Sequence, residues 1–292
     1  MQFPLWAGFG LISATLSTGV MLTQERFKLP GFVMAYWVKV FSALFALPFV
    51  IWLGVPSDPA FYVLLSLQAV LWVINDVIFF NTITRTGAGV VSRILPLSVI
   101  VTFFAWFIVD PSTLQKYLAT PYLSAGVVAA LGASVYFVLR LKKCAISWAA
   151  IKMLWFVLFS AVAGPIVQKI LLGHASVKDG PFAFVFFEAL AMLLMWPVYY
   201  ALRRPVAWRE MVSLRAARGG GCVAAFSFLM VASNVVALIY VDNPGLLPAV
   251  KFVDSFMILL IYKMTGRKEQ NDVLSGVGIV LCAAVIVIFK SF

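Results

Sequence analysis

The sequence predicts an all-α integral membrane protein in which ten transmembrane helices form two inverted five-helix repeats around a central cavity. Three observations lead to this prediction. The composition is very apolar, ten apolar segments are long enough to span a bilayer, and a shift of about 150 residues places similar residues of the two halves on one another.

The composition separates this chain from soluble proteins. Of its 292 residues, 63% are hydrophobic and 11% are charged, whereas about a quarter of the residues of a soluble domain are charged. A net charge of +11 would indicate nucleic-acid binding in a soluble protein. Here most basic residues lie in short connections between apolar segments, where lipid headgroups and topology explain them. We therefore expect membrane lipids, and no nucleic acid, as partners.

About 20 apolar residues cross the hydrocarbon core of a bilayer. Ten segments meet this length, at 4–22, 32–53, 60–80, 88–109, 121–139, 148–172, 182–202, 220–241, 245–263 and 273–289. The first segment has no basic region and no small-residue cleavage site before or after it, so we expect a membrane helix there and not a signal peptide. The connection at about 203–218 carries five arginines and is predicted to hold a short basic interfacial helix.

The two halves of the chain carry polar residues and glycines at matching positions. The segment Met34–Pro48 aligns with Ala183–Pro197. The segment from Asp76 to Arg93 aligns without a gap with the segment from Asn234 to Lys251. The matched pairs are Gly19 with Gly164, Lys39 with Glu188, Asp76 with Asn234, Arg93 with Lys251, and Gly126 with Gly278. We predict a first repeat at residues 1–143 and a second at 144–292. Because five helices is an odd number, the second repeat must be inverted.

The basic residues predict an orientation in the membrane. The odd-numbered connections contain fourteen Lys and Arg residues, whereas the even-numbered connections and the termini contain three, Lys116, Lys178 and Lys290. Positively charged connections usually stay in the cytoplasm. We therefore expect the odd-numbered connections in the cytoplasm and both termini outside.

These features resemble the drug/metabolite transporter superfamily and, within it, the bacterial EamA-like members. The local resemblance lies in the basic residue of the second helix, Lys39, and in a charged turn, 266–269, before a last helix that contains Gly276 and Gly278. The resemblance implies transport of a small metabolite across the bacterial cytoplasmic membrane, without nucleotide or cofactor, and it names no substrate. Members of this family usually keep both termini in the cytoplasm, which differs from the charge count.

Ionisable residues within membrane spans are costly and usually functional. Helix rise places Lys39 about 12 Å and Arg93 about 9 Å into their spans. The same counting of residues along each helix places the polar side chains in two layers, one on either side of the bilayer midplane. We predict that these layers bind substrate or form gates. One layer contains Lys39, Asp76 and Arg93, and the other contains Glu188, Asn234, Lys251 and Asp254.

The chemistry of these layers leaves two interpretations open. Basic residues attract a carboxylate or phosphate, and acidic residues hold an ammonium group or a proton, so protons are the candidate coupling ion. Alternatively, Lys39 with Asp76 and Lys251 with Asp254 are internal ion pairs that offset one another's desolvation. Five aromatic residues near the layers are candidates to line the cavity, although core packing or lipid contact also explains them: Tyr36, Trp72, Trp155, Phe187 and Tyr240.

The leading functional prediction is a secondary active or facilitative transporter of a small amphipathic or zwitterionic metabolite, either amino-acid-like or an organic anion. One alternative is a flippase for a lipid or a lipid-linked phosphate headgroup. A less favoured alternative is a membrane enzyme that modifies lipids, but the chain has one histidine, His174, and no HExxH or Gly-x-Ser-x-Gly motif. We therefore predict no catalytic residue, metal or cofactor. Monomer and dimer both fit the sequence.

Overall fold

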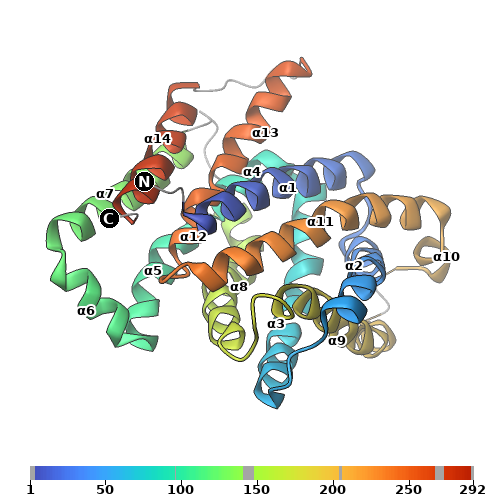
Figure 1. Cartoon of the computed structure of the whole chain (residues 1–292). Coiled ribbons are helices and arrows are strands. Elements are labelled where there is room, and N and C mark those ends of the chain that lie inside the picture. Colours follow the sequence, from blue (N-terminus) through green and yellow to red (C-terminus); the bar gives the residue numbers. More distant parts are fainter. Residues whose placement is uncertain (1–3, 96, 141–147, 204–205, 267–272, 291–292) are drawn as a thin grey trace.

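The computed structural model describes residues 4–95, 97–140, 148–203, 206–266 and 273–290. Within these ranges the chain forms fourteen helices and no strand (Figure 1). The predicted boundary between the two repeats, after residue 143, lies outside the described residues.

The helices follow one another with short connections. In the first half they are α1 (Leu5–Phe27), α2 (Gly31–Leu53), α3 (Pro59–Thr86), α4 (Ala88–Ile94), α5 (Leu97–Val109), α6 (Pro111–Ala119) and α7 (Pro121–Arg140). In the second half they are α8 (Trp148–Leu172), α9 (Gly180–Arg203), α10 (Trp208–Met211), α11 (Leu214–Tyr240), α12 (Leu246–Lys251), α13 (Val253–Met264) and α14 (Val273–Phe289).

This is a multi-pass membrane protein, because eight of the described helical stretches are long and apolar enough to span a bilayer. One of the eight is Ala88–Val109, which comprises α4 and α5. The predicted spans at 245–263 and 273–289 correspond to α12 with α13 and to the shorter α14. Helices α1, α3 and α11 extend beyond the predicted apolar segments. A helix satisfies its own backbone hydrogen bonds and can therefore continue into the headgroup region with polar side chains.

The connections contain Asp-Pro pairs, and these start the following helix by capping its first turn. Asp58 caps α3 by accepting a hydrogen bond from the Ala60 amide at 2.9 Å, and Pro59 occupies the first turn. Asp110 and Pro111 start α6 in the same way. Because residues 110–120 lie between two of the predicted spans, α6 was not predicted. Asp-Pro is a loop signal and a helix-start signal at once, and the local hydrogen bonds favour the helix.

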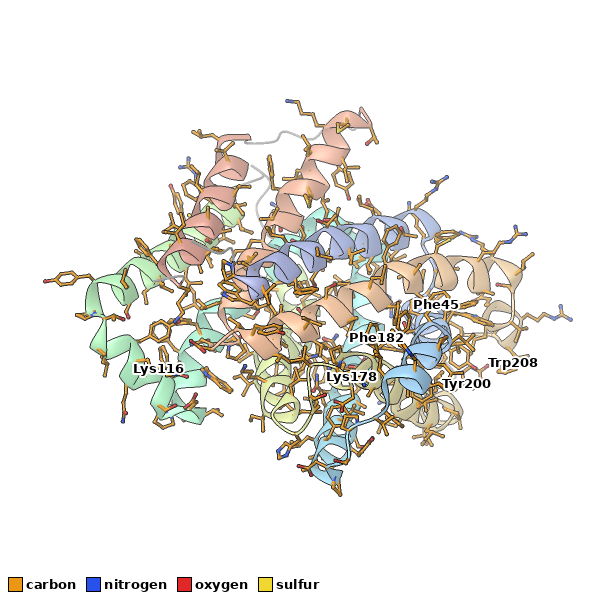
Figure 2. The ribbon with its side chains drawn as sticks, in the orientation of Figure 1. Phe45, Lys116, Lys178, Phe182, Tyr200 and Trp208 are labelled. Atoms are coloured by element: carbon orange, nitrogen blue, oxygen red, sulfur yellow. The ribbon has the colours of Figure 1, made fainter. Side chains whose placement is uncertain are left out.

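The predicted basic interfacial helix between α9 and α11 is short: among the described residues of this connection, 206–213, Trp208–Met211 is helical. Trp208 is 62% exposed and packs edge-on against Tyr200 of α9, with ring centroids 6.1 Å apart. The two aromatic side chains lie together at one end of the molecule (Figure 2). Such amphipathic rings suit the membrane–water interface.

Two of the predicted spans are each divided into two helices near their middle. The span 88–109 forms α4, which ends at Ile94, and α5, which begins at Leu97. The span 245–263 forms α12 and α13, with Phe252 between them. Arg93 and Lys251 lie in the last turn before each break. Broken helices occur at membrane depth only where the backbone is buried in protein or lines a cavity.

Several pairs of packed helices recur when the two halves of the chain are exchanged. Helix α1 packs on α11 as α8 packs on α3, and α2 packs on α11 as α9 packs on α3. Helices α2 and α9 pack on each other, and so do α7 and α14, which lie side by side at one edge of the molecule (Figure 1).

In the contact between α7 and α14, single residues of the two halves also exchange places. Gly126 of α7 packs against the ring of Phe289, and Gly278 of α14 packs against the ring of Phe137. Both members of the second contact lie 152 residues from their equivalents in the first. Glycine allows the helices to approach closely, as small residues do at membrane helix interfaces.

Contacts between helix ends define two faces of the molecule. On the face that we call the basic face, Arg215 donates to the Phe27 carbonyl at 2.8 Å and the Trp37 indole donates to the Met211 carbonyl at 2.6 Å. On the opposite face, the terminal face, His174 contacts Asp58 at 2.7 Å. Lys290, directly after α14, approaches Asp242 at 3.8 Å on the same terminal face, where α1 also begins (Figure 1).

Candidate functional site

A cavity of about 270 Å³ lies between the two halves of the chain. Residues of α1, α3, α5, α8, α11, α12 and α13 line it, and Ser92 of α4 completes the wall. Its charged and amide side chains are Asn75, Asp76, Gln168, Asn234, Lys251 and Asp254. The apolar part of the wall includes Trp72, Phe79 and Val157.

One polar group of the cavity is built around the break between α12 and α13. Lys251 Nζ donates to Asn234 Oδ1 of α11 at 3.3 Å. Asp254, in the first turn of α13, accepts a hydrogen bond from Ser17 of α1 at 3.0 Å and another from Ser255 at 3.3 Å. The break therefore places an ammonium group and a carboxylate three residues apart on the cavity wall, each held by a neighbour.

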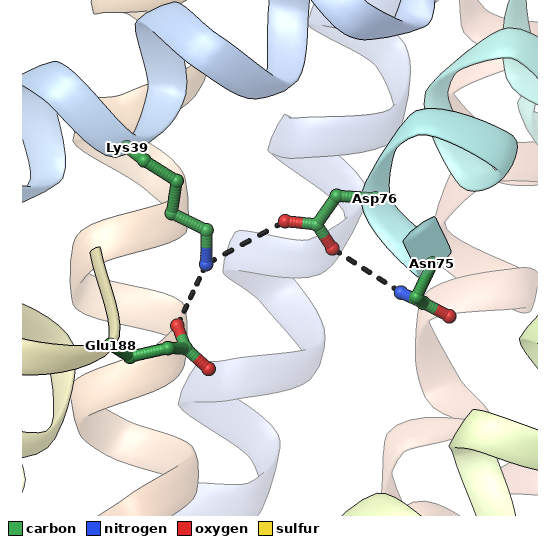
Figure 3. Close-up of polar contacts among 4 residues, drawn as sticks. All are labelled: Lys39, Asn75, Asp76 and Glu188. Atoms are coloured by element: carbon green, nitrogen blue, oxygen red, sulfur yellow. Dashed lines mark hydrogen bonds and ion pairs between the residues drawn. The ribbon is translucent and has the colours of Figure 1, made fainter. Parts of the chain in front are cut away.

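A second polar group is a buried cluster of three charges (Figure 3). Lys39 Nζ of α2 lies 2.7 Å from Glu188 Oε2 of α9 and 3.6 Å from Asp76 Oδ2 of α3. The Asn75 amide donates to the other Asp76 oxygen at 3.2 Å. The side chains of Lys39, Asp76 and Glu188 are 10%, 17% and 6% exposed. Asp76 lines the cavity, whereas Lys39 and Glu188 pack behind it.

The contact between Lys39 and Glu188 corrects one prediction, because the two residues were expected in separate layers. Each lies eight residues after the start of its helix, Gly31 or Gly180, and the two helices start at opposite faces. Eight residues correspond to about 12 Å. In a hydrocarbon core about 30 Å thick, only about 6 Å remains between them, which two long side chains span. Equivalent positions this close to the midplane meet each other.

Arg93 does not appear among the residues that line the cavity. Its side chain is 2% exposed, and Nε donates to the Gly89 carbonyl of its own helix at 2.8 Å. Its neighbours Ser92 and Leu95 line the cavity instead. Helix rise predicted the depth of Arg93 but could not predict the direction of its side chain.

Of the five candidate aromatic residues, the described cavity wall contains Trp72. Trp72 and Asp76 are four residues apart on α3 and therefore share a helix face. Tyr36 packs on Trp37 and Trp196, and Phe187 packs edge-on against Tyr62. Trp155 and Tyr240 are 64% and 44% exposed, on the outer surface. Trp155 is two positions from Val157, which lines the cavity, so its side chain points to nearly the opposite side of α8.

The sequence analysis missed five neutral polar residues that line the cavity: Ser17, Asn75, Ser92, Ser98 and Gln168. Each is a polar side chain within an apolar helix, and this signal was available in the sequence. The emphasis on charged residues left them out, although amides and hydroxyls satisfy a ligand's hydrogen bonds at a lower desolvation cost.

The first span of each half is tied to the third span by a side-chain donor. The Gln24 amide of α1 donates to the Phe80 carbonyl of α3 at 3.1 Å, and Lys169 of α8 donates to the Leu238 carbonyl of α11 at 2.8 Å. The donors are 145 residues apart and the acceptors 158, the same offsets that match Gly19 with Gly164 and Asp76 with Asn234. Lys169, which snorkelling alone would explain, therefore has a specific partner.

The cavity lies closer to the terminal face than to the basic face. Its wall includes Leu238, two residues before the end of α11, and Pro244 in the connection to α12. Toward the basic face the wall reaches Ser92, four residues after the start of α4. On α1 and α3 it ends at Met21 and Phe79, six and seven residues before the ends of these helices.

Beyond the cavity, polar contacts join helices near the basic face. Gln24 also donates to the Leu29 carbonyl and to Thr84. The Tyr262 hydroxyl of α13 donates a short hydrogen bond to Glu25 of α1. These contacts join α1 to α3 and to α13 between the cavity and the basic face.

No protein-family model and no curated protein matches the sequence. Among solved structures, the chain is similar to one described as "Crystal structure of protein", with a TM-score of 0.64, 12% sequence identity and full coverage of both chains. At this identity the likeness shows a shared fold and carries no information about the function.

Proposed function

We propose that this protein is a secondary active or facilitative carrier of a small amphipathic or zwitterionic metabolite, which it moves by alternating access. The observation that carries the proposal is a cavity that presents both signs of charge and is lined by both halves of the chain. Lys251 with the Asn234 amide suits a carboxylate of the substrate. Asp76 or Asp254 suits an ammonium group, and the Trp72 wall suits an apolar substituent.

The contacts exchanged between the two halves support two inverted five-helix repeats. The α7–α14 glycine contacts, the Gln24 and Lys169 donors, and the helix pairs around α2 and α9 all recur with the halves interchanged. We propose that the ten predicted spans are arranged in this way, with the broken spans α4–α5 and α12–α13 in equivalent places. Carriers with inverted repeats bind their substrate near the midplane, at the repeat interface and beside broken helices.

The asymmetry of the two faces supports alternating access. On the basic face Tyr262, which is 3% exposed, is bonded to Glu25. The positions at equivalent offsets near the terminal face are Phe104 and Ile170, which are 49% and 39% exposed and cannot form this bond. We propose that the cavity in this structure opens toward the terminal face. We propose further that the contact between Glu25 and Tyr262 is broken in the other state, in which the cavity opens toward the basic face.

We further propose that the protein belongs to the drug/metabolite transporter superfamily and resides in the bacterial cytoplasmic membrane. The ten predicted spans and their two halves support this membership. The excess of basic residues in the odd-numbered connections supports a cytoplasmic basic face and termini on the outside.

The proposal is tested by a thermal-shift screen of the purified protein in detergent. The panel contains amino acids, carboxylates, quaternary amines, nucleotides and lipid headgroups. A bound ligand raises the melting temperature by mass action, with about 2.7 kcal/mol of stabilisation at 100 times its Kd. Lys251→Met removes the cavity ammonium but keeps an apolar stem, and Lys116→Met makes the same change on α6.

We expect a small metabolite to stabilise the wild type and Lys116→Met but not Lys251→Met, and to be taken up by proteoliposomes. A response confined to lipid headgroups would replace the metabolite carrier by a flippase. A hit that Lys251→Met retains would contradict the assignment of the site to this cavity. No binding and no uptake for the whole panel would overturn the proposal.

A further inference from the structure

The buried cluster behind the cavity has one more carboxylate than ammonium groups. Lys39 lies within 4.0 Å of both Glu188 and Asp76, so one positive charge is shared between two negative charges. Glu188 has the shorter contact and lies deeper than Asp76, which reaches the cavity wall. An uncompensated buried charge is costly, and a carboxyl group avoids that cost by binding a proton.

The other charged groups around the cluster are placed differently. Lys251 and Asp254 line the cavity as a pair of opposite charges on one wall, and Arg93, on α4, bonds its own helix through Nε. Helices α1 and α8, which also pack against α3, contribute the neutral Ser17 and Gln168 to the wall. Within the described residues, the ion pairs of Asp76 and Glu188 are those with Lys39.

We propose that the Lys39–Asp76–Glu188 cluster binds one exchangeable proton, shared by the two carboxyl groups, and that this proton is the coupling ion of the carrier. The coupling role rests on the proposed function, whereas the proton site does not. The proton enters from solvent through the cavity onto Asp76 and leaves by the same way. Its binding changes the charge of the cluster from −1 to 0, with no other bond formed or broken.

A comparison of the two halves of the chain predicts one proton site in each molecule. At the position that matches Asp76, the second half has Asn234, an amide with the shape of a neutral carboxyl group. Asn234 contacts Lys251 without adding a negative charge. The surplus carboxylate therefore exists in one half, which predicts one proton for each carrier molecule.

The test needs no substrate, because Trp72 lies one helical turn before Asp76 and lines the same cavity. We would record tryptophan fluorescence of the purified protein from about pH 5 to about pH 9, the range around neutrality in which a coupling proton must exchange. Subtraction of a Trp72→Phe variant isolates the signal of this residue. We expect a single transition whose steepness corresponds to one proton.

Two variants remove the surplus charge in different ways. Asp76→Asn leaves Lys39 with Glu188, and Glu188→Gln leaves Lys39 with Asp76, so each cluster is neutral without a proton and the transition should be lost in both. Asp254→Asn makes the same chemical change elsewhere in the cavity and should keep the transition. Asp76→Glu should also keep it, which separates loss of the acid from loss of folding. Gel filtration and melting curves verify that every variant is folded.

Several results would overturn the proton site: no transition in the wild type, a transition that survives in both neutral-cluster variants, or its loss in Asp254→Asn. Coupling is then measured in proteoliposomes with a trapped pH indicator and a compound that stabilises the protein. Internal pH that changes with uptake of the compound supports coupling, and uptake without a pH change refutes it. If no compound binds, the proposed carrier fails while the titration still decides the proton site.

Discussion

Replacement of Lys39 should destabilise the folded protein more than replacement of either of its partners. Lys39→Met leaves Asp76 and Glu188 together, buried and without their cation. Removing one partner of a buried pair costs about 3–5 kcal/mol. An independent estimate agrees, because holding one carboxyl group neutral at pH 7, about three units above its ordinary pKa, costs about 4 kcal/mol. Glu188→Gln keeps the contact between Lys39 and Asp76, so we expect a cost of about 1–3 kcal/mol.

The assay is reversible unfolding of the purified variants in mixed detergent micelles, followed by circular dichroism at several pH values. Lys178→Met, an exposed lysine of the α8–α9 connection (Figure 2), is the matched control and should behave as the wild type. The destabilisation by Lys39→Met should shrink as the pH falls, because both states of the variant then bind protons. A cost for Lys39→Met that is equal to or below that of Glu188→Gln, or that is independent of pH, would refute this reasoning.

Three further predictions concern the two faces of the molecule. Tyr262→Phe removes the hydrogen bond to Glu25, worth about 1.5–3 kcal/mol for a charged acceptor; thiol reagents applied at the basic face should then label a cysteine introduced into the cavity, and unchanged labelling would argue against a latch. The Ala60 amide and His174 lower the pKa of Asp58, so its carboxylate stabilises the fold above the ordinary pKa and this contribution is lost as the pH falls. Asp58→Asn should therefore lower the melting temperature near neutral pH and match the wild type in acid, whereas an equal deficit at both pH values would contradict the role of the charge. A reporter fused after Phe292 should be active only outside the cytoplasm; cytoplasmic activity would reverse the proposed orientation.

Helix positions followed from the sequence because lipid imposes a strong and local rule. Any segment in the hydrocarbon core must be helical and apolar over about 20 residues, and this can be read from the chain alone. The ranges predicted for α2, α9 and α14 accordingly lie close to those in the structure. Helix α6 was not predicted, since it depends on local capping.

The candidate site, too, could be predicted from the sequence only in part. The sequence by itself identified the costly residues, and it matched Lys39 with Glu188 and Asp76 with Asn234 across the two halves. Only the tertiary structure decided that Lys39 and Glu188 contact each other, that Asp76 faces the cavity and that Arg93 does not. Helix rise determines the depth of a residue, but the direction of its side chain and its partner depend on how helices distant in the sequence pack together.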